Sequence, residues 1–377
     1  MKKLLCILLM LMLLITACAL PGNNEAAGVD IEVKSLLEAK LQSVKSADVE
    51  MLMAILDPGD KELQREQANW LKDIKINPIE SYSLELMGVD KVKDTEYKAK
   101  LRQRYSEDGK EYKLDYYNKY KRIDGKLYDA GNYFEELKQG NITIKYTSAN
   151  KKLAEDVMQD MNQLYLDHTK RWGITPSRPM VIKMFDDIEE LRQSIKFSMW
   201  QCGGWYEYGE SVKLYMKKPF ASKETMKYVV NHEMVHLFTV EKAAGNLAYW
   251  LSEGIASYYE LPQNQKSPSQ LMREMDVNLM TVDELESVEL EKLEDQKQIS
   301  DYYSNAHLIT AFIIENYGAE KINEVLNELS KMPSFTGTTS ENDMHYRRYL
   351  SQVLPKVLGL KDYETFKQLW ENEKNKL

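Results

Sequence analysis

Residues 229–238 read VVNHEMVHLF, and this stretch decides which fold and which chemistry the sequence predicts. Residues four apart lie on the same face of a helix, so His232 and His236 can hold one metal ion between them. Glu233 sits about 100° further round the helix, where its carboxylate can reach a water at the metal without binding the metal. The apolar flanks bury the helix, and buried histidines without partners are costly. The spacing therefore predicts a metal centre.

A third ligand decides the class of metal centre. Metzincins carry a glycine three residues after the second histidine and another histidine three residues later, but this chain has Thr239 and Lys242 there. Residues 249–260 read YWLSEGIASYYE and predict a second helix. Glu253 on that helix would complete a set of two histidines and one glutamate, and the small Gly254 would allow close packing. Such a set leaves one coordination position open for water.

The two motifs together resemble the gluzincins, and especially the peptidase MA-like group. HExxH is followed by WLxEGxAxYxE, and the resemblance covers two predicted helices within a domain over residues 141–377. It implies that His232, His236 and Glu253 bind one Zn²⁺ ion per chain. It further implies that Glu233 is the general base, and that Glu260 is the hydrogen-bond partner of a ligand imidazole.

The resemblance also implies hydrolysis of peptide bonds by attack of an activated water, which needs a donor for the oxyanion. The family's later helix opens with a tyrosine and closes at Tyr-Gly, and residues 303–318 resemble it. Tyr303 is the candidate donor and His307 the alternative, while the register leaves Tyr302 open. The chain lacks the Gly-x-Met-Glu-Asn motif with which zinc aminopeptidases hold a free amine, so an endopeptidase is expected rather than an aminopeptidase.

The segment before the metal helix suggests where a peptide would lie. Residues 212–216 predict a strand, which is expected to be the sheet edge that pairs with an extended peptide. Gly203-Gly204 would allow a close approach of the backbone. Cys202 is expected to be a free buried cysteine rather than a thiolate that caps the metal.

The first residues predict export. Residues 1–17 combine two lysines with an apolar run too short to span a bilayer, which is typical of a secretory signal. Residues 15–18 read ITAC and resemble the lipobox of bacterial lipoproteins, so Cys18 is expected to carry the lipid. Acyl chains on Cys18 would anchor the protein to the extracytoplasmic face of the cell membrane. Residues 18–32 are small and polar, and predict a flexible tether.

Composition excludes other classes of protein. The chain of 377 residues is 43% hydrophobic and 29% charged, which predicts folded domains. Its formal charge is −9, and −11 without Lys2 and Lys3, so no basic field favours nucleic acid. Of the three cysteines, Cys6 leaves with the signal and Cys18 is the lipid site, so no intrachain disulfide is expected.

The pattern of elements predicts an α+β fold in two domains. Residues 33–140 read as helices followed by antiparallel hairpins with turns at Asp108-Gly109 and Asp124-Gly125, and resemble a cystatin-like roll. Residues 141–377 predict a small mixed sheet, including a helix at 188–197, and then a helical subdomain. The roll is expected to serve as a spacer or substrate-docking module.

The sequence thus predicts a lipid-anchored zinc metallopeptidase that acts on peptides or proteins. One alternative is a non-catalytic lipoprotein that binds zinc on a degenerate gluzincin scaffold. The intact Glu233 argues against this alternative, because a structural zinc site needs no base. A receptor for a transported ligand would require the roll's tyrosines to form a deep pocket.

Overall fold

The alternating residues after Pro78 form a four-stranded antiparallel sheet, in the order β1 (Ser81–Lys93), β2 (Glu96–Glu107), β3 (Lys110–Ile123) and β4 (Lys126–Asn132). The computed structural model describes residues 23–76, 78–107, 109–195, 202–217, 223–335, 337 and 339–377. Side chains of β2 alternate between buried and more exposed, as a half-buried strand requires. Asp124 and Gly125 adopt φ of 48° and 82°, so the predicted second turn is a left-handed one.

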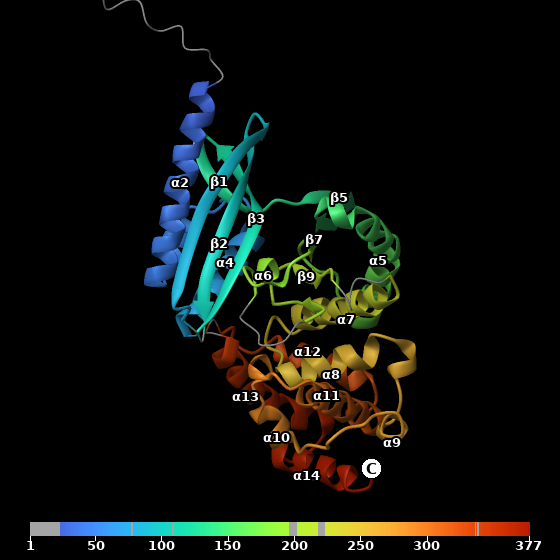
Figure 1. Ribbon diagram of the computed structural model, residues 1–377. Helices are drawn as coiled ribbons and strands as arrows, with labels where there is room; N and C mark the ends of the chain where they lie inside the picture. Colours follow the sequence, from blue (N-terminus) through green and yellow to red (C-terminus); the bar gives the residue numbers. More distant parts are fainter. Residues whose placement is uncertain are drawn as a thin grey trace, which may run out of the picture. The chain divides into compact units, whose positions relative to one another are not determined.

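The helices α2 (Asn23–Ser46) and α3 (Val49–Met53) precede this sheet and share a compact unit with it. The long blue helix α2 runs beside β1 (Figure 1). It corrects the predicted tether: residues 23–32 are helical, because the apolar stripe begins at Val29, which is buried like Val33. The described residues within 23–59 and 80–133 form one compact unit, called unit 1 here. Its likeness to a cystatin-like roll stays a prediction.

A second unit, unit 2, combines residues 60–79 with residues 134–377. Its five-stranded sheet has the order β5-β6-β7-β9-β8. The strands are β5 (Glu135–Gln139), β6 (Ile142–Tyr146), β7 (Met180–Phe185), β8 (Gly204–Trp205) and β9 (Val212–Tyr215). Among the described residues β8 lies outside β9 and pairs with it antiparallel, so β9 is not the sheet edge that the sequence predicted. A two-residue strand carries no periodicity, which is why the sequence did not indicate β8.

Helices α5 (Lys151–Trp172) and α7 (Lys223–Lys242) pack on one another and on this sheet. The predicted helix at 188–197 is short, since α6 spans only Ile188–Leu191; residues 196–201 lie outside the described part. The rest of the unit is helical, as predicted. It consists of α8 (Tyr249–Tyr259), α9 (Pro268–Leu271), α10 (Val282–Ser287), α11 (Gln296–Tyr317), α12 (Glu320–Leu329), α13 (Thr339–Leu358) and α14 (Tyr363–Lys374). Three single turns, η1 (Ser148–Asn150), η2 (Pro262–Asn264) and η3 (Leu290–Lys292), interrupt the unit.

Helix α4 (Lys61–Ile76) precedes the strands of unit 1 in sequence but belongs to unit 2. It brings the buried Glu66 to two buried lysines of the sheet: Glu66 Oε2 lies 2.6 Å from Lys183 Nζ, and its Oε1 lies 3.4 Å from Lys213 Nζ. Burial alone would raise the pKa of Glu66, but the two lysines lower it to about 2. The boundary at 140/141 expected from sequence therefore differs from the observed division, because ion pairs between distant segments leave no periodic signal.

Within the described residues, no helix is both long and apolar enough to cross a bilayer. The predicted signal at 1–17 and the predicted lipid site Cys18 lie outside the described residues.

Candidate metal centre

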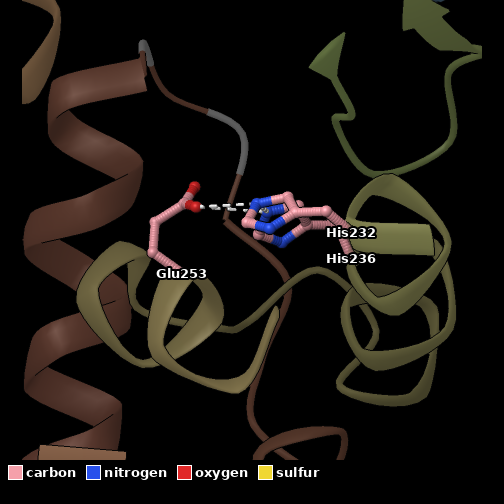
Figure 2. A group of neighbouring side chains, drawn as sticks. All are labelled: His232, His236 and Glu253. Atoms are coloured by element: carbon pink, nitrogen blue, oxygen red, sulfur yellow. Dashed lines mark hydrogen bonds and ion pairs between the residues drawn. The ribbon is translucent and has the colours of Figure 1, made fainter. Parts of the chain in front are cut away.

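Three side chains from α7 and α8 converge on one point, as Figure 2 shows. His232 and His236 lie one turn apart on α7, and their Nε2 atoms are 3.0 Å apart. Glu253 reaches across from α8, with Oε2 at 3.2 Å from His232 Nε2 and 3.3 Å from His236 Nε2. These are the three ligands that the sequence predicts for zinc, and the structure brings them together.

The three donor atoms fit a zinc ion. Zn–N distances of 2.0–2.1 Å in a tetrahedral site separate the ligand atoms by about 3.3–3.4 Å. The observed separations of 3.0–3.3 Å are close to that value. Two imidazoles and one carboxylate also form the kind of donor set that catalytic zinc uses, with a further coordination position left for water.

The outer nitrogen of each imidazole has an oxygen partner. His232 Nδ1 lies 2.8 Å from Glu260 Oε2, the contact predicted for Glu260, and His236 Nδ1 lies 2.9 Å from Ser252 Oγ. An acceptor at Nδ1 holds the proton there and leaves the Nε2 lone pair for a metal. Glu260 is itself held by Asn264, whose Nδ2 donates to Glu260 Oε1 at 2.9 Å.

The sequence motifs did not single out Ser252 and Asn264 as partners of the metal centre. Ser252 directly precedes a ligand within a motif already singled out, so a search for polar neighbours of Glu253 would have found it. Asn264 lies in η2, and nothing in the sequence connects it to His232.

Glu233 lies at the same centre but is left free to act on a water. Its carboxylate is buried, and among the described residues Oε2 has no hydrogen-bond partner. Burial raises the pKa of Glu233, against the opposing effect of His236 and His232. The backbone of Gly204 passes so close that a Cβ there would collide with this carboxylate. The predicted close approach at Gly203-Gly204 is thus present at Gly204.

Close helix packing positions Glu253. A Cβ at Gly254 would collide with the carbonyl oxygen of Ala306 and with Thr310 Oγ1 on α11, so α8 and α11 touch backbone to backbone there. Around this contact, Trp250, Leu251 and Ile255 of α8 are buried in the core of unit 2. Gly254 therefore lets α8 pack closely on α11, and this packing fixes the position of its neighbour Glu253 opposite α7.

Helix α11 carries the three residues considered as oxyanion donors, and it begins at Gln296, well before Tyr303. Tyr303 lines the cleft at the metal centre, with its ring 6.5 Å from that of His232. Tyr302 points into the core and is 3% exposed. His307 Nε2 lies 3.0 Å from the carbonyl oxygen of Asn264, and its ring packs on Tyr258. This corrects the alternative role of His307, because its nitrogen is directed to a backbone carbonyl and not to the cleft.

An open cleft lies beside the metal centre, and Glu233 and Tyr303 both line it. The edge strand β8 forms one side of it through Gly204 and Trp205. Cys202, next to this strand, is free and buried as predicted, and burial raises the pKa of its thiol to about 12. A protonated thiol is a poor metal ligand.

Residues 161–346 match the family model described as the Peptidase MA superfamily. The matched segment contains α7, α8 and α11 and every residue of the metal centre, so the resemblance to a gluzincin-type peptidase is supported for this part of the chain. No curated protein matches the chain.

Two solved structures show more distant likeness. Native yeast LTA4 hydrolase is 10% identical, with a TM-score of 0.35, over 77% of this chain and 44% of its own. The present chain thus spans less than half the length of that hydrolase. A SEC-C motif containing protein from Rhodopseudomonas palustris is 14% identical, with a TM-score of 0.22, over 26% of this chain and 74% of its own.

Proposed function

We propose that this protein is a zinc metallopeptidase that hydrolyses internal peptide bonds. The observation that carries the proposal is the convergence of His232, His236 and Glu253 in a cleft where Glu233 Oε2 has no partner among the described residues. A structural zinc site usually fills all four positions with protein ligands and needs no free base. The match to the Peptidase MA superfamily supports the same class.

Each side chain has a defined task in this proposal. His232, His236 and Glu253 hold the ion, and Glu260 and Ser252 fix the two rings through Nδ1. A bound zinc ion would act as a Lewis acid toward water and the substrate carbonyl. Glu233 takes the proton from the attacking water at Oε2 and passes it to the leaving amine. Tyr303 donates its phenol proton in a hydrogen bond to the oxygen that becomes negative.

The test compares three proteins for bound zinc and for peptide hydrolysis. We expect wild type to hold one zinc per chain by elemental analysis and to cleave an unstructured protein. Glu233→Gln should keep the zinc and lose at least about a hundredfold in kcat, because proton transfer by a positioned base contributes that much. His236→Ala should lose both. Hydrolysis retained by Glu233→Gln would contradict the role of this glutamate as base.

The hydrolysis measurement, and not the zinc content, separates the peptidase from the non-catalytic alternative. A binding lipoprotein on the same scaffold would hold zinc equally in wild type and Glu233→Gln and cleave nothing in either. Endopeptidase action is supported by the absent Gly-x-Met-Glu-Asn motif, and products with internal cleavage points by mass spectrometry would bear it out.

We propose further that the protein is anchored by lipid on Cys18 at the extracytoplasmic face of the cell membrane. The proposal is supported by the two lysines, the apolar run and the ITAC sequence of residues 1–18. Phase partition in a detergent that clouds on warming tests it. Wild type should enter the detergent phase and Cys18→Ser should stay in water. Equal partition of the two proteins would contradict lipidation.

A further inference from the structure

Four carboxylates line the cleft, and only two of them take part in the proposed chemistry. Glu233 and Glu253 belong to the metal centre, while Glu207 and Glu291 have no part in it. Among the described residues that line this cleft there is no lysine and no arginine. The described lining thus holds two carboxylates besides those of the metal centre.

The two additional glutamates come from segments far apart in the sequence. Glu207 follows the edge strand β8, and Glu291 lies in η3. Both side chains are half-buried. Tyr249 also lines the cleft, and its hydroxyl donates a hydrogen bond to Glu207 Oε1 at 3.4 Å. A half-buried carboxylate interacts with an incoming charge more strongly than one in open solvent does.

The same carboxylates also raise the pKa of two neighbouring tyrosines. Burial, followed by the charges of Glu207 and Glu291, raises the pKa of Tyr249 well above its usual value. Burial and the charge of Glu207 also raise the pKa of Tyr346. Arg347 is a cation of this region, but its Nε lies 3.1 Å from Asp343 Oδ2, in an ion pair beside the cleft lining.

Aromatic rings complete this wall. Four tyrosines line the same cleft besides Tyr303, namely Tyr206, Tyr208, Tyr249 and Tyr346. The guanidinium of Arg65 lies over the ring of Tyr208, 5.2 Å from its centroid, so a second cation would meet the other rings. The face of an aromatic ring attracts ammonium and guanidinium groups, and the aliphatic stem of lysine or arginine packs well along such rings. Carboxylates set among aromatic rings favour a long side chain that ends in a positive charge.

We propose that Glu207 and Glu291 select peptide substrates with a lysine or arginine side chain close to the scissile bond. The inference rests on the proposed peptidase function and names its substrate class. A carboxylate pair with ring faces beside the metal centre would bind the cation, while β8 pairs with the peptide backbone. A charge-assisted hydrogen bond is directional, so the pair also fixes which peptide bond reaches the metal.

The experiment uses acetylated, amidated peptides in matched pairs, lysine against norleucine and arginine against citrulline at one position. We expect zinc-loaded wild type to cleave the cationic member with kcat/KM at least about tenfold higher, since hydrogen bonds to charged groups contribute that much. Glu207→Gln and Glu291→Gln should each reduce the ratio, and the double variant should bring it close to one. Glu294→Gln, an exposed neighbour three residues beyond Glu291, should keep the wild-type ratio.

The outcomes separate this inference from the function on which it rests. Equal cleavage of both members by wild type overturns the inference alone, and zinc-loaded wild type that cleaves no peptide overturns the peptidase function as well. A second arm repeats the pairs with a free amino terminus. If cleavage then depends on the free amine and not on the side chain, the carboxylates bind the amine and the side-chain proposal is wrong. Zinc content of each variant shows that a lower ratio does not come from a lost metal centre.

Discussion

Single atoms decide whether the two histidines can serve a metal. Glu260 and Ser252 both meet an Nδ1 atom, so the Nε2 atoms of His232 and His236 are turned toward each other and toward Glu253. A carboxylate partner makes its imidazole a stronger ligand than a hydroxyl partner does. The two rings of this centre are therefore not equivalent, although the sequence motif presents them as a symmetric pair.

Tyr303 is placed to donate to the oxyanion, and its protonation state matters for that role. Burial and the charges of Glu253 and Glu233 raise the pKa of Tyr303 well above its usual value, so its phenol is protonated at neutral pH and can donate. Tyr303→Phe should keep the zinc and lower kcat about 10²–10³-fold, as loss of one oxyanion donor does. Kinetics with a single peptide measure the loss. Tyr302→Phe, one residue away in the core, is the matched control, and an equal loss in both variants would contradict this assignment.

At the scale of elements, the contact of α8 with α11 holds the ligand Glu253 in place. Gly254→Ala adds a methyl group against the backbone of Ala306 and the hydroxyl of Thr310. We expect the free energy of unfolding to fall by about 1–3 kcal/mol, as overpacking typically costs, with weaker zinc binding as α8 shifts. Urea unfolding and zinc titration measure the two effects.

Gly28→Ala is the helical control for that change. A Cβ at Gly28 meets nothing within 4 Å, and alanine suits a helix better than glycine by about 0.5–1 kcal/mol. Gly28→Ala should therefore leave zinc binding unchanged and not destabilise the protein. Normal zinc affinity in Gly254→Ala would mean that α8 adjusts without moving Glu253.

The attachment of α4 depends on charge and hence on pH. Glu66→Gln should lower the free energy of unfolding at pH 7 by about 3–5 kcal/mol, because Lys183 and Lys213 lose a buried counter-charge. The folded state holds the pKa of Glu66 at about 2, below its ordinary value of 4.5. Its stabilisation is therefore complete above pH 4.5 and is lost as the pH falls toward 2.

Urea unfolding at several pH values measures this dependence. The difference between wild type and Glu66→Gln should stay constant from pH 7 to about pH 5 and shrink below that. Glu364→Gln, whose side chain is 69% exposed, should change stability by less than about 0.5 kcal/mol. A difference that grows on acidification would contradict the pairing of Glu66 with the lysines.

At the scale of the whole molecule, the chain enters unit 2, returns to unit 1 and then completes unit 2. All six tryptophans lie in residues 60–79 and 134–377, so tryptophan fluorescence reports on unit 2 alone. The candidate metal centre also lies in unit 2, so removal of the metal should affect the two units differently. Zinc at a hundred times its Kd should stabilise unit 2 by about 2.7 kcal/mol.

The measurement is thermal unfolding by tryptophan fluorescence, with and without a chelator, together with amide hydrogen exchange. The chelator should lower the Tm and speed exchange in α7 and α8, while β2 and β3 of unit 1 keep their protection. His236→Ala should show no response to zinc or chelator. Equal loss of protection in both units would mean that they unfold as one.

The sequence alone was enough to predict which three side chains converge at the candidate metal centre. His232, Glu233 and His236 lie within one turn and a half of α7, and their relation follows from the rise and twist of a helix, which any helix-forming sequence shares. Glu253 required only that a second helix pack nearby. The elements of unit 1 and the helical end of unit 2 were equally readable, because their apolar periods are long.

Only the tertiary structure decided which residues surround that chemistry. Ser252 and Glu260 contact the imidazoles, and β8 takes the sheet edge in place of β9. Helix α4 belongs to unit 2, although the strands of unit 1 follow it in the sequence. Glu207 and Glu291 stand more than eighty residues apart and line one cleft. Contacts of this kind depend on how separate elements pack, and hydrophobic periodicity, which is a property of each element by itself, carries no information about them.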